Sequence, residues 1–421
     1  MVRNIFVLVF AVIILGGLYL FFGDWVYPKK KVVKIGILHS LTGTMAVSET
    51  PLVDAYLLAV EKINQQGGVL GNQIEAIVVD GQSNDSTFAI EAEKLIVEEK
   101  VSAVFGCWTS SCRKTVKPIF EKHSHLLFYP LQHEGLEKSP NIIYTGAAPN
   151  QQIIPAIKWC FDHLGEKFYL VGSDYVFPHT ANRIIKDLLS VLGGKVVGES
   201  YIPLGSTDVK KVVEDIIATQ PQVIINTING DSNNAFFLEF RGGEFDTKSI
   251  ATMSFSIAEQ ELKDLGELNL VNDYAAWNYF QNIESPVNAK FLQSFKEKYG
   301  GERVVDDPME AAYIGIHLWA LAAEAAGSVE PQGIRSGIAG KSLMGPEGYV
   351  FVESDNHHLW KTLRIGKVQN NQQFKIVWSS VEPIRPVPFP IYRTRAEWNF
   401  FLKNLYAGWG DKWEKPVLIK N

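Results

Sequence analysis

The chain has 421 residues, of which 46% are hydrophobic and 20% are charged, and its net charge is −6 at pH 7. This composition is typical of a globular protein, and no Lys/Arg-rich run of the nucleic-acid-binding type is present, so DNA and RNA are excluded as expected partners. A single hydrophobic core usually stops growing near about 250–300 residues, so the length predicts two lobes.

An unbroken apolar run, Ile5 to Phe22, lies near the N-terminus. As a helix it would be about 27 Å long, just enough to cross the hydrocarbon core of a membrane. No A-x-A cleavage site and no cysteine for lipid attachment lies near it. We therefore expect residues 1–31 to be an uncleaved hydrophobic anchor helix or an atypical signal peptide, with the rest of the chain on the periplasmic or extracellular face of the cytoplasmic membrane. Arg3 favours an inward N-terminus and Lys29–Lys31 oppose it, so the orientation stays open.

From Val32 onward, short apolar segments alternate with amphipathic ones, a pattern typical of parallel sheets with helices on both faces. The first series predicts strands at 32–38, 74–80, 101–105 and 126–129 and helices at 51–66, 86–99 and 113–122. The second predicts helices at 151–163, 182–192, 209–218 and 234–241 and strands at 168–171, 196–201, 223–226 and 249–253. Helices at 286–299 and 308–326 and strands at 349–352, 359–365 and 374–378 follow. The predicted fold class is α/β, with two doubly wound, Rossmann-like lobes around a ligand cleft.

The stretch from Gly106 to Lys114, GCWTSSCRK, follows a predicted strand and precedes a predicted helix. In open α/β sheets, ligands bind at this end of the strands. Hydroxyls and free backbone N–H groups at a helix N-terminus can hold the oxygen of a small polar molecule. Trp108, Thr109 and Ser110 are therefore candidate binding residues. The alternative is that Ser110 or Ser111 only caps the helix.

The three cysteines are Cys107, Cys112 and Cys160, and they form no C-x-x-C pair and no zinc-ligand spacing with histidines. A disulfide between Cys107 and Cys112 would suit an oxidising compartment. We favour buried free thiols, because the backbone between the two residues must turn from strand to helix, and the disulfide stays open as the alternative.

Motifs of common enzymes are absent from the chain: G-x-S-x-G, H-E-x-x-H, the P-loop and G-x-G-x-x-G. The pair Asp306-Asp307 precedes Pro308, which is more typical of a helix N-terminus than of acid–base chemistry. We therefore expect no enzyme activity, no cofactor and no metal site.

Five further segments end predicted strands with polar or aromatic residues. They span residues 39–44, 129–135, 172–178, 226–231 and 254–256. Each alone could be turn chemistry. Six such segments at the same end of successive strands indicate a binding cleft.

These segments resemble the urea and short-chain-amide substrate-binding proteins of ABC transporters, a branch of the type I periplasmic binding proteins. The matching words are GILHSLTGTMA from Gly36, GCWTS from Gly106, FYPLQ from Phe128, YTGAAPNQQ from Tyr144, VGSDYVFP from Val171 and EPIRPVP from Glu382. The resemblance runs from about Val33 to the Pro-rich tail, and the words together are specific for the amide/urea branch.

The resemblance implies two lobes joined by three crossover segments near Ala147, Ala276 and Glu353. Lobe 1 would then hold residues 32–147 and 277–353. Lobe 2 would hold residues 148–276 and 354–380, and a tail at 381–421 would pack on the lobes.

The resemblance also implies that Ser110 binds the ligand through its hydroxyl and its backbone N–H, and that Tyr129 and Tyr175 face the ligand from opposite lobes. Gln132 falls where an amide-binding relative has a proline, so it would add a polar contact suited to urea. Asp231 or Glu49 could accept an N–H from the ligand. The expected ligand-binding residues are Trp108, Thr109, Ser110, Tyr129, Gln132, Tyr175, Asn229, Asp231 and Ser254.

The function implied is an extracytoplasmic receptor that captures urea or a short-chain amide by hinge closure and delivers it to the permease subunits of an ABC transporter. The alternative is a sensor subunit of a regulatory or two-component system. An amidase-like hydrolase is disfavoured, because no nucleophile–base pair can be named. The sequence leaves open which small solute binds and the oligomeric state.

Overall fold

The structure is a computed structural model that describes residues 32–266 and 268–416. The anchor helix predicted within residues 1–31 lies outside the described residues. Among the helices that are described, none is both long enough and apolar enough to cross a membrane.

The first lobe is built on a parallel sheet with the strand order β2-β1-β3-β4-β5. Strand β1 is flanked by β2 and β3 and has buried residues on both faces, which explains its nearly continuous apolar sequence. The strands are β1 (Val32–His39), β2 (Gln73–Asp80), β3 (Val104–Gly106), β4 (Leu127–Tyr129) and β5 (Ile142–Tyr144).

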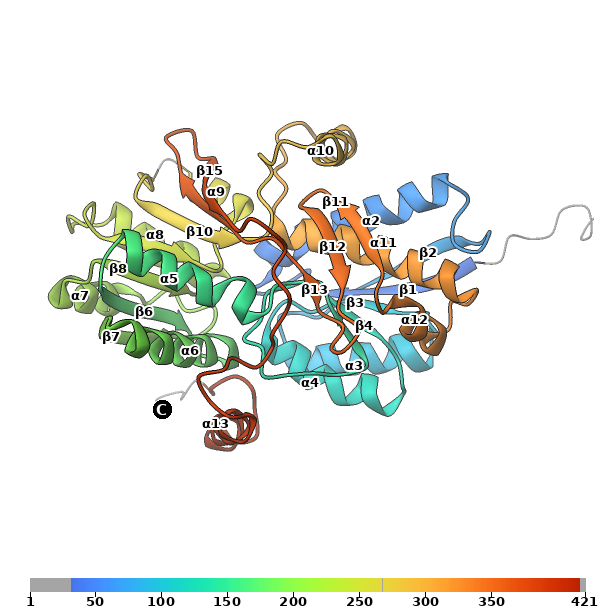
Figure 1. The fold of residues 1–421 in the computed structure, drawn as a ribbon, viewed down its shortest axis with the longest axis horizontal. Helices are drawn as coiled ribbons and strands as arrows, with labels where there is room; N and C mark the ends of the chain where they lie inside the picture. The colour runs from blue at the N-terminus through green and yellow to red at the C-terminus, as the bar shows by residue number, and fades with distance from the viewer. Residues whose placement is uncertain (1–31, 267, 417–421) are drawn as a thin grey trace, which may run out of the picture.

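Helices cover both faces of this sheet (Figure 1). Helix α11 packs on α2 and α12 on one side, and α3 packs on α4 on the other. The helices of this lobe are α2 (Ala46–Gln65), α3 (Asp85–Val97), α4 (Ser110–Lys122), α10 (Pro286–Tyr299), α11 (Asp307–Ala326) and α12 (Pro331–Ile338).

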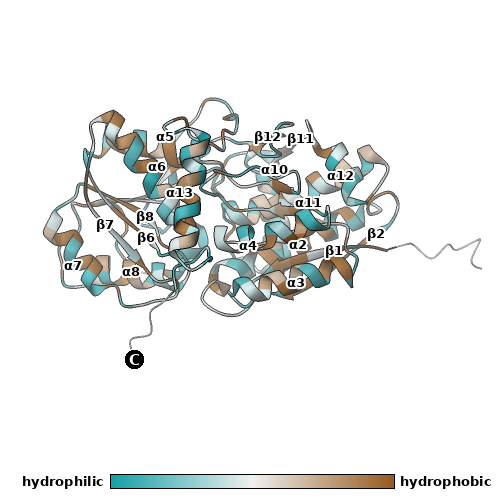
Figure 2. Cartoon of the chain, turned by 90° about the horizontal axis from the view of Figure 1, so that it is seen from below, coloured by the Kyte–Doolittle hydropathy of each residue, from teal (hydrophilic) through white to brown (hydrophobic). Residues whose placement is uncertain are grey.

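The second lobe is built on a seven-stranded sheet with the order β15-β14-β10-β9-β8-β6-β7. The strands from β10 to β7 are parallel, and β14 and β15 extend the sheet in the antiparallel sense. Apolar strands such as β6 and β8 lie between helices, and these helices have one apolar and one polar side (Figure 2). The strands are β6 (Lys167–Ser173), β7 (Lys195–Ile202), β8 (Val223–Thr227), β9 (Ala251–Ser254), β10 (Asp273–Trp277), β14 (Arg364–Val368) and β15 (Phe374–Ser379). The helices are η1 (Pro149–Gln151), α5 (Ile153–His163), α6 (Val176–Leu192), α7 (Lys210–Thr219), α8 (Asp231–Gly242) and α9 (Glu259–Asp264).

A small antiparallel sheet on the first lobe differs from the prediction. It contains β11 (Ser342–Gly345), β12 (Gly348–Val352) and β13 (Leu359–Trp360). The single strand predicted at 359–365 is in fact two strands, because β13 pairs with β12 in this sheet whereas β14 pairs with β10 in the second lobe. The chain therefore crosses between the lobes after Trp360, later than the crossover predicted near Glu353.

Side-chain amides tie the three crossover segments together. Gln151 Nε2 donates to the carbonyl of Leu359 at 2.7 Å, and Gln152 Nε2 donates to the carbonyl of Ala276 at 2.6 Å. Asn278 Nδ2 donates to the carbonyl of Thr362 at 3.1 Å. Each crossover thus contacts another one through a side-chain amide.

The C-terminal part of the chain runs along the junction of the lobes and forms α13 (Arg395–Gly408) beneath it (Figure 1). Trp398 of this helix is fully buried in the hydrophobic core of the second lobe. Arg393 donates to Asp187 of α6 at 2.8 Å. The tail is therefore fastened to the second lobe.

Candidate ligand-binding site

The loop between β3 and α4 is shaped by Cys107, whose φ of +61° is unusual for a residue other than glycine. This turn and the first turn of α4 bring the Cα atoms of Cys107 and Cys112 to 5.8 Å, and the two residues form a disulfide. The preference for free thiols at these two positions was therefore wrong, because the turn from strand to helix brings the two cysteines together. Cys160 is a buried free thiol.

The N-cap of α4 is Thr109, whose hydroxyl accepts from the backbone N–H of Cys112 at 3.0 Å. The alternative that Ser110 or Ser111 caps this helix is therefore not borne out. Both serines lie inside the first turn, and each hydroxyl donates to a carboxylate.

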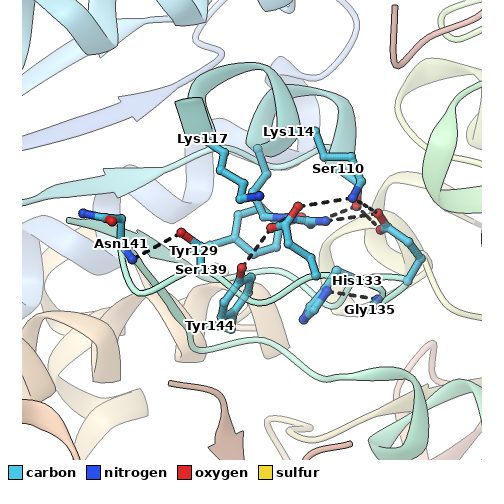
Figure 3. A network of polar contacts seen from close by, with 12 residues as sticks. Ser110, Lys114, Lys117, Tyr129, His133, Gly135, Ser139, Asn141 and Tyr144 are labelled. Carbon is cyan, nitrogen blue, oxygen red and sulfur yellow. Dashed lines mark hydrogen bonds and ion pairs between the residues drawn. The ribbon is translucent and has the colours of Figure 1, made fainter. Parts of the chain in front are cut away.

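The hydroxyl of Ser110 belongs to a buried network of charged groups (Figure 3). It donates to Glu134 and accepts from Arg113 Nη1 at 3.0 Å. Arg113 also donates to Glu134 at 3.1 Å, and its guanidinium lies 4.7 Å from the ring centre of Tyr129. The hydroxyl that was expected to bind the ligand is thus committed to this network.

The network is balanced in charge, with two cations and two carboxylates. Arg113 Nε donates to Glu137 at 3.0 Å, and Lys114 Nζ lies 3.2 Å from both Glu134 and Glu137. Burial raises the pKa of Glu137, but Lys114 and Arg113 outweigh it and hold that pKa well below its usual range. Removing one partner of such a buried ion pair strongly destabilises the folded protein, because the other charge is left buried without a partner.

Trp108 and Tyr175 come from opposite lobes and are joined by one amide. The indole N–H of Trp108 donates to Asn229 Oδ1 at 3.3 Å, and Asn229 Nδ2 donates to the hydroxyl of Tyr175 at 3.1 Å. The hydroxyl of Tyr129 donates to the carbonyl of Trp108 at 2.6 Å, which fixes the loop. These four predicted residues are therefore brought together at the cleft.

Further bonds cross between the lobes. Gln132 Nε2 donates to the carbonyl of Phe255 at 2.7 Å, and Ser48 donates to Glu261 at 2.8 Å. The backbone N–H of Asp231 donates to the hydroxyl of Thr44 at 3.3 Å. The cleft is therefore closed in this structure.

Asp231 and Ser254 lie apart from the other predicted residues. The side chain of Asp231 is exposed at the start of α8. Ser254 is buried inside the second lobe, where its hydroxyl accepts from Asn226 at 3.1 Å. Both residues follow predicted strands, and a position at a strand end does not determine in which direction a side chain points.

A small cavity of about 10 Å³ lies between the lobes. Thr109 and Tyr175 are the predicted residues that line it. Its other lining residues are Ser40, Met45, Glu49, Ser83, Asp85, Phe88, Ser111, Leu204 and Glu414.

Glu49 is a buried carboxylate in the wall of this cavity. It is 1% exposed, and its Oε2 accepts from the backbone N–H of Ser40 at 2.9 Å and lies 2.8 Å from Nδ1 of His39. Of the two N–H acceptors considered from the sequence, the structure places Glu49, and not Asp231, in the cavity wall. The sequence alone does not indicate Asp85 or Glu414, which come from other parts of the chain.

Residues 33–395 match the family model described as "Periplasmic binding protein domain". The chain belongs to this family. It is 22% identical to Leu/Ile/Val-binding protein homolog 6 of Brucella suis over 349 residues, which cover 80% of the chain and 87% of that protein. A shorter stretch of 124 residues is 34% identical to limonene hydroxylase of Geobacillus stearothermophilus, but it covers 30% of the chain and 23% of that protein.

Solved structures of this fold superpose on most of the chain. A solute-binding protein from R. palustris in complex with 4-hydroxybenzoate has a TM-score of 0.76 at 21% identity, covering 84% of this chain and 98% of that one. The branched-chain amino acid binding protein of Streptococcus pneumoniae in complex with isoleucine has a TM-score of 0.72 at 22% identity, covering 84% and 100%. The two-lobed α/β fold predicted from the sequence is therefore confirmed. The relatives that match over most of their length are binding proteins, so this periplasmic binding protein is a solute-binding protein and not an enzyme, as the sequence predicted.

Proposed function

We propose that this periplasmic binding protein is an extracytoplasmic receptor for urea or a short-chain amide, which it captures by hinge closure and delivers to the permease of an ABC transporter. The observation that carries the proposal is the cavity between the lobes, which is very small and has an acidic lining. The matching words of the amide/urea branch support the same ligand class. The type I fold and the family's periplasmic members support the proposed location and partner.

The size of the cavity favours a small guest. A water molecule needs about 10–15 Å³ of such space, so the closed cleft holds about one water. Urea and formamide exceed this by a few heavy atoms and need only small side-chain movements. Isoleucine and 4-hydroxybenzoate, found in complex with solved structures of this fold, are larger still and would need the lobes to move further apart.

The charges around the cavity favour a guest rich in N–H groups. Glu49, Asp85 and Glu414 line it, and no Lys or Arg does so among residues 32–266 and 268–416. The nearby Arg113 and Lys114 are paired with carboxylates. An anionic ligand would therefore lack a free cation, whereas an amide N–H can donate to a carboxylate and its carbonyl can accept from hydroxyls.

The proposed guest sets a limit on affinity. Urea has about four heavy atoms, and a ceiling near −1.5 kcal/mol per atom gives about −6 kcal/mol, or a Kd of tens of micromolar. A Kd below this range would require that ligand binding also drives formation of the contacts between the lobes, which then add to the binding free energy.

A calorimetric screen tests the proposal with urea, formamide, acetamide, guanidinium, isoleucine and 4-hydroxybenzoate. We expect urea or a short amide to bind most tightly, and Glu49→Gln to weaken that binding at least about tenfold, because a charged acceptor is worth roughly 1.5–3 kcal/mol. Glu61→Gln, a change on the same helix at a partly exposed residue outside the cavity, should leave the affinity unchanged. If isoleucine or 4-hydroxybenzoate binds more tightly than every amide, the proposed ligand class is wrong. If guanidinium binds most tightly, the proposal that the ligand is neutral is wrong.

A further inference from the structure

The last residues that the structure describes form a strap, which we define as residues 411–416. The backbone N–H of Val176 donates to the carbonyl of Trp413 at 2.9 Å, and the backbone N–H of Lys415 donates to the carbonyl of Asp174 at 3.1 Å. Between these bonds, Tyr175 and Glu414 form a β-bridge. The strap is thus added to the second lobe directly beside Tyr175, a residue of the ligand cavity.

The same strap reaches the first lobe. Lys114 Nζ lies 5.2 Å from the ring centre of Trp413, a cation–π contact between the lobes. Glu414 lines the ligand cavity opposite Asp85, the first residue of α3. The strap therefore contacts both lobes beside the cavity.

Glu414 and Asp85 also form a wall between the cavity and the outside. Both residues line a second, open groove of about 800 Å³ that lies between α3, α4 and α13. Ser83 is the only other residue that both spaces share, as far as the described residues show. A ligand that enters from this groove must pass these two carboxyl groups.

The surroundings of Glu414 combine burial with mixed charge. Asp85 faces it from α3, Lys412 comes from the strap, and Asp174 comes from the β6–α6 loop. The carboxylate of Asp174 is itself paired with Lys415 at 3.0 Å and with His179 at 2.7 Å. Burial, with Asp85 second, raises the pKa of Glu414 to about 7. Burial likewise raises the pKa of Asp85, although Ser111 donates to it.

We propose that Glu414 is a cavity residue supplied by the C-terminal strap, and that it seals the closed cleft against Asp85 by holding a proton that an open cleft would release. The part of this inference that concerns ligand affinity rests on the proposed function; the seal itself does not. The seal makes closure dependent on pH. A carboxyl whose pKa is raised in the closed form favours closure below pH 7 and ceases to do so as the pH rises through 7.

A carboxyl titration followed by NMR on protein labelled at glutamate tests the seal. We expect one glutamate signal to titrate near pH 7 in the ligand-free or the amide-saturated protein, and to be absent in Glu414→Gln. Asp85→Asn should shift this titration to lower pH, since it removes the facing charge. Asp411→Asn, an exposed carboxylate in the same strap, should leave it in place.

Calorimetry gives the second measurement. In wild-type protein and in Asp411→Asn, amide affinity should fall about tenfold between pH 6 and pH 8.5, with proton uptake on binding near pH 7. In Glu414→Gln, both the pH dependence and the proton uptake should be lost. This variant keeps the shape of the side chain and stays neutral, so its thermal unfolding temperature at pH 6 should be no lower than that of the wild type.

The two proposals fail separately. If none of the amides binds but Glu414 titrates near pH 7, the proposed function is wrong and the seal stands. If Glu414 titrates at the ordinary value for glutamate with and without ligand, or if Asp85→Asn leaves its titration unchanged, the seal is overturned whatever the ligand is.

Discussion

Trp108 and Asn229 meet across the cleft, with the indole N–H of one lobe donating to the side-chain oxygen of the other at 3.3 Å. The same amide donates to Tyr175, so a single side chain holds an aromatic group from each lobe. A closed cleft needs contacts that exist only when it is closed, and this pair is one of them. Closure is thereby coupled to the position of the loop that carries Thr109.

Replacing Asn229 with alanine should favour the open cleft. Of its bonds, the one to Trp108 crosses the cleft and is worth about 0.5–1.5 kcal/mol, so amide affinity should weaken about two- to thirteenfold. Calorimetry measures the affinity, and small-angle scattering measures the compaction on ligand addition. Asn371→Ala, at an exposed turn of the second lobe, is the matched control and should behave as wild type. Equal affinity in Asn229→Ala would show that the bonds do not contribute to closure.

Ser110→Ala tests the buried network rather than a simple ligand contact. The hydroxyl lies between Glu134 and Arg113, so its loss leaves buried charged groups short of a partner. We expect the free energy of unfolding to fall by about 1–3 kcal/mol and the amide affinity to fall with it. Thermal unfolding and calorimetry measure the two effects. A variant of unchanged stability and tenfold weaker binding would instead return Ser110 to the role of a direct ligand contact.

The alternation of strands and helices could be predicted because parallel strands are buried on both faces and leave continuous apolar runs. Boundaries at the cleft were harder to predict. Helix α6 starts at Val176, six residues before the predicted start at 182, because buried contacts with both lobes and the strap fix its first turn. The run from Leu359 to Ile365 was predicted as one strand, yet the chain leaves one sheet and joins another within it.

The site was predictable in part for a related reason. Trp108, Tyr129 and Tyr175 lie together in the structure, since topology alone brings such strand-end positions together. Side-chain pairing over long sequence separations has no periodic signal. The bond of Ser110 to Glu134 and the contribution of Glu414 therefore became visible only in the folded chain.

The disulfide between Cys107 and Cys112 should hold the binding loop in place. Its closed loop is short, so the double change Cys107→Ser with Cys112→Ser should lower the free energy of unfolding by about 2 kcal/mol. It should also weaken amide binding, because the left-handed conformation at residue 107 is then less constrained. Thermal unfolding and calorimetry, with and without reductant, measure both effects. Cys160→Ala, at a buried cysteine outside the disulfide, should leave the affinity unchanged. If the protein keeps its wild-type affinity after the disulfide is fully reduced, the disulfide does not hold the binding loop in place.

The loss of stability at acid pH should depend on His317. Burial lowers the pKa of this imidazole to about 4, and its Nε2 has no hydrogen-bond partner among the described residues. The unfolded chain binds a proton there below about pH 6.5 whereas the folded protein does not, so stability is complete above pH 6.5 and falls as the pH drops towards 4. At pH 5 the loss from this residue should be about 2 kcal/mol. His317→Phe keeps a ring beside Tyr313 and should therefore reduce the drop in the thermal unfolding temperature between pH 7 and pH 5. His163→Gln, at an exposed site, should leave that drop unchanged. An equally steep acid loss in His317→Phe would assign it to other buried groups, such as His358, whose pKa burial lowers to about 3.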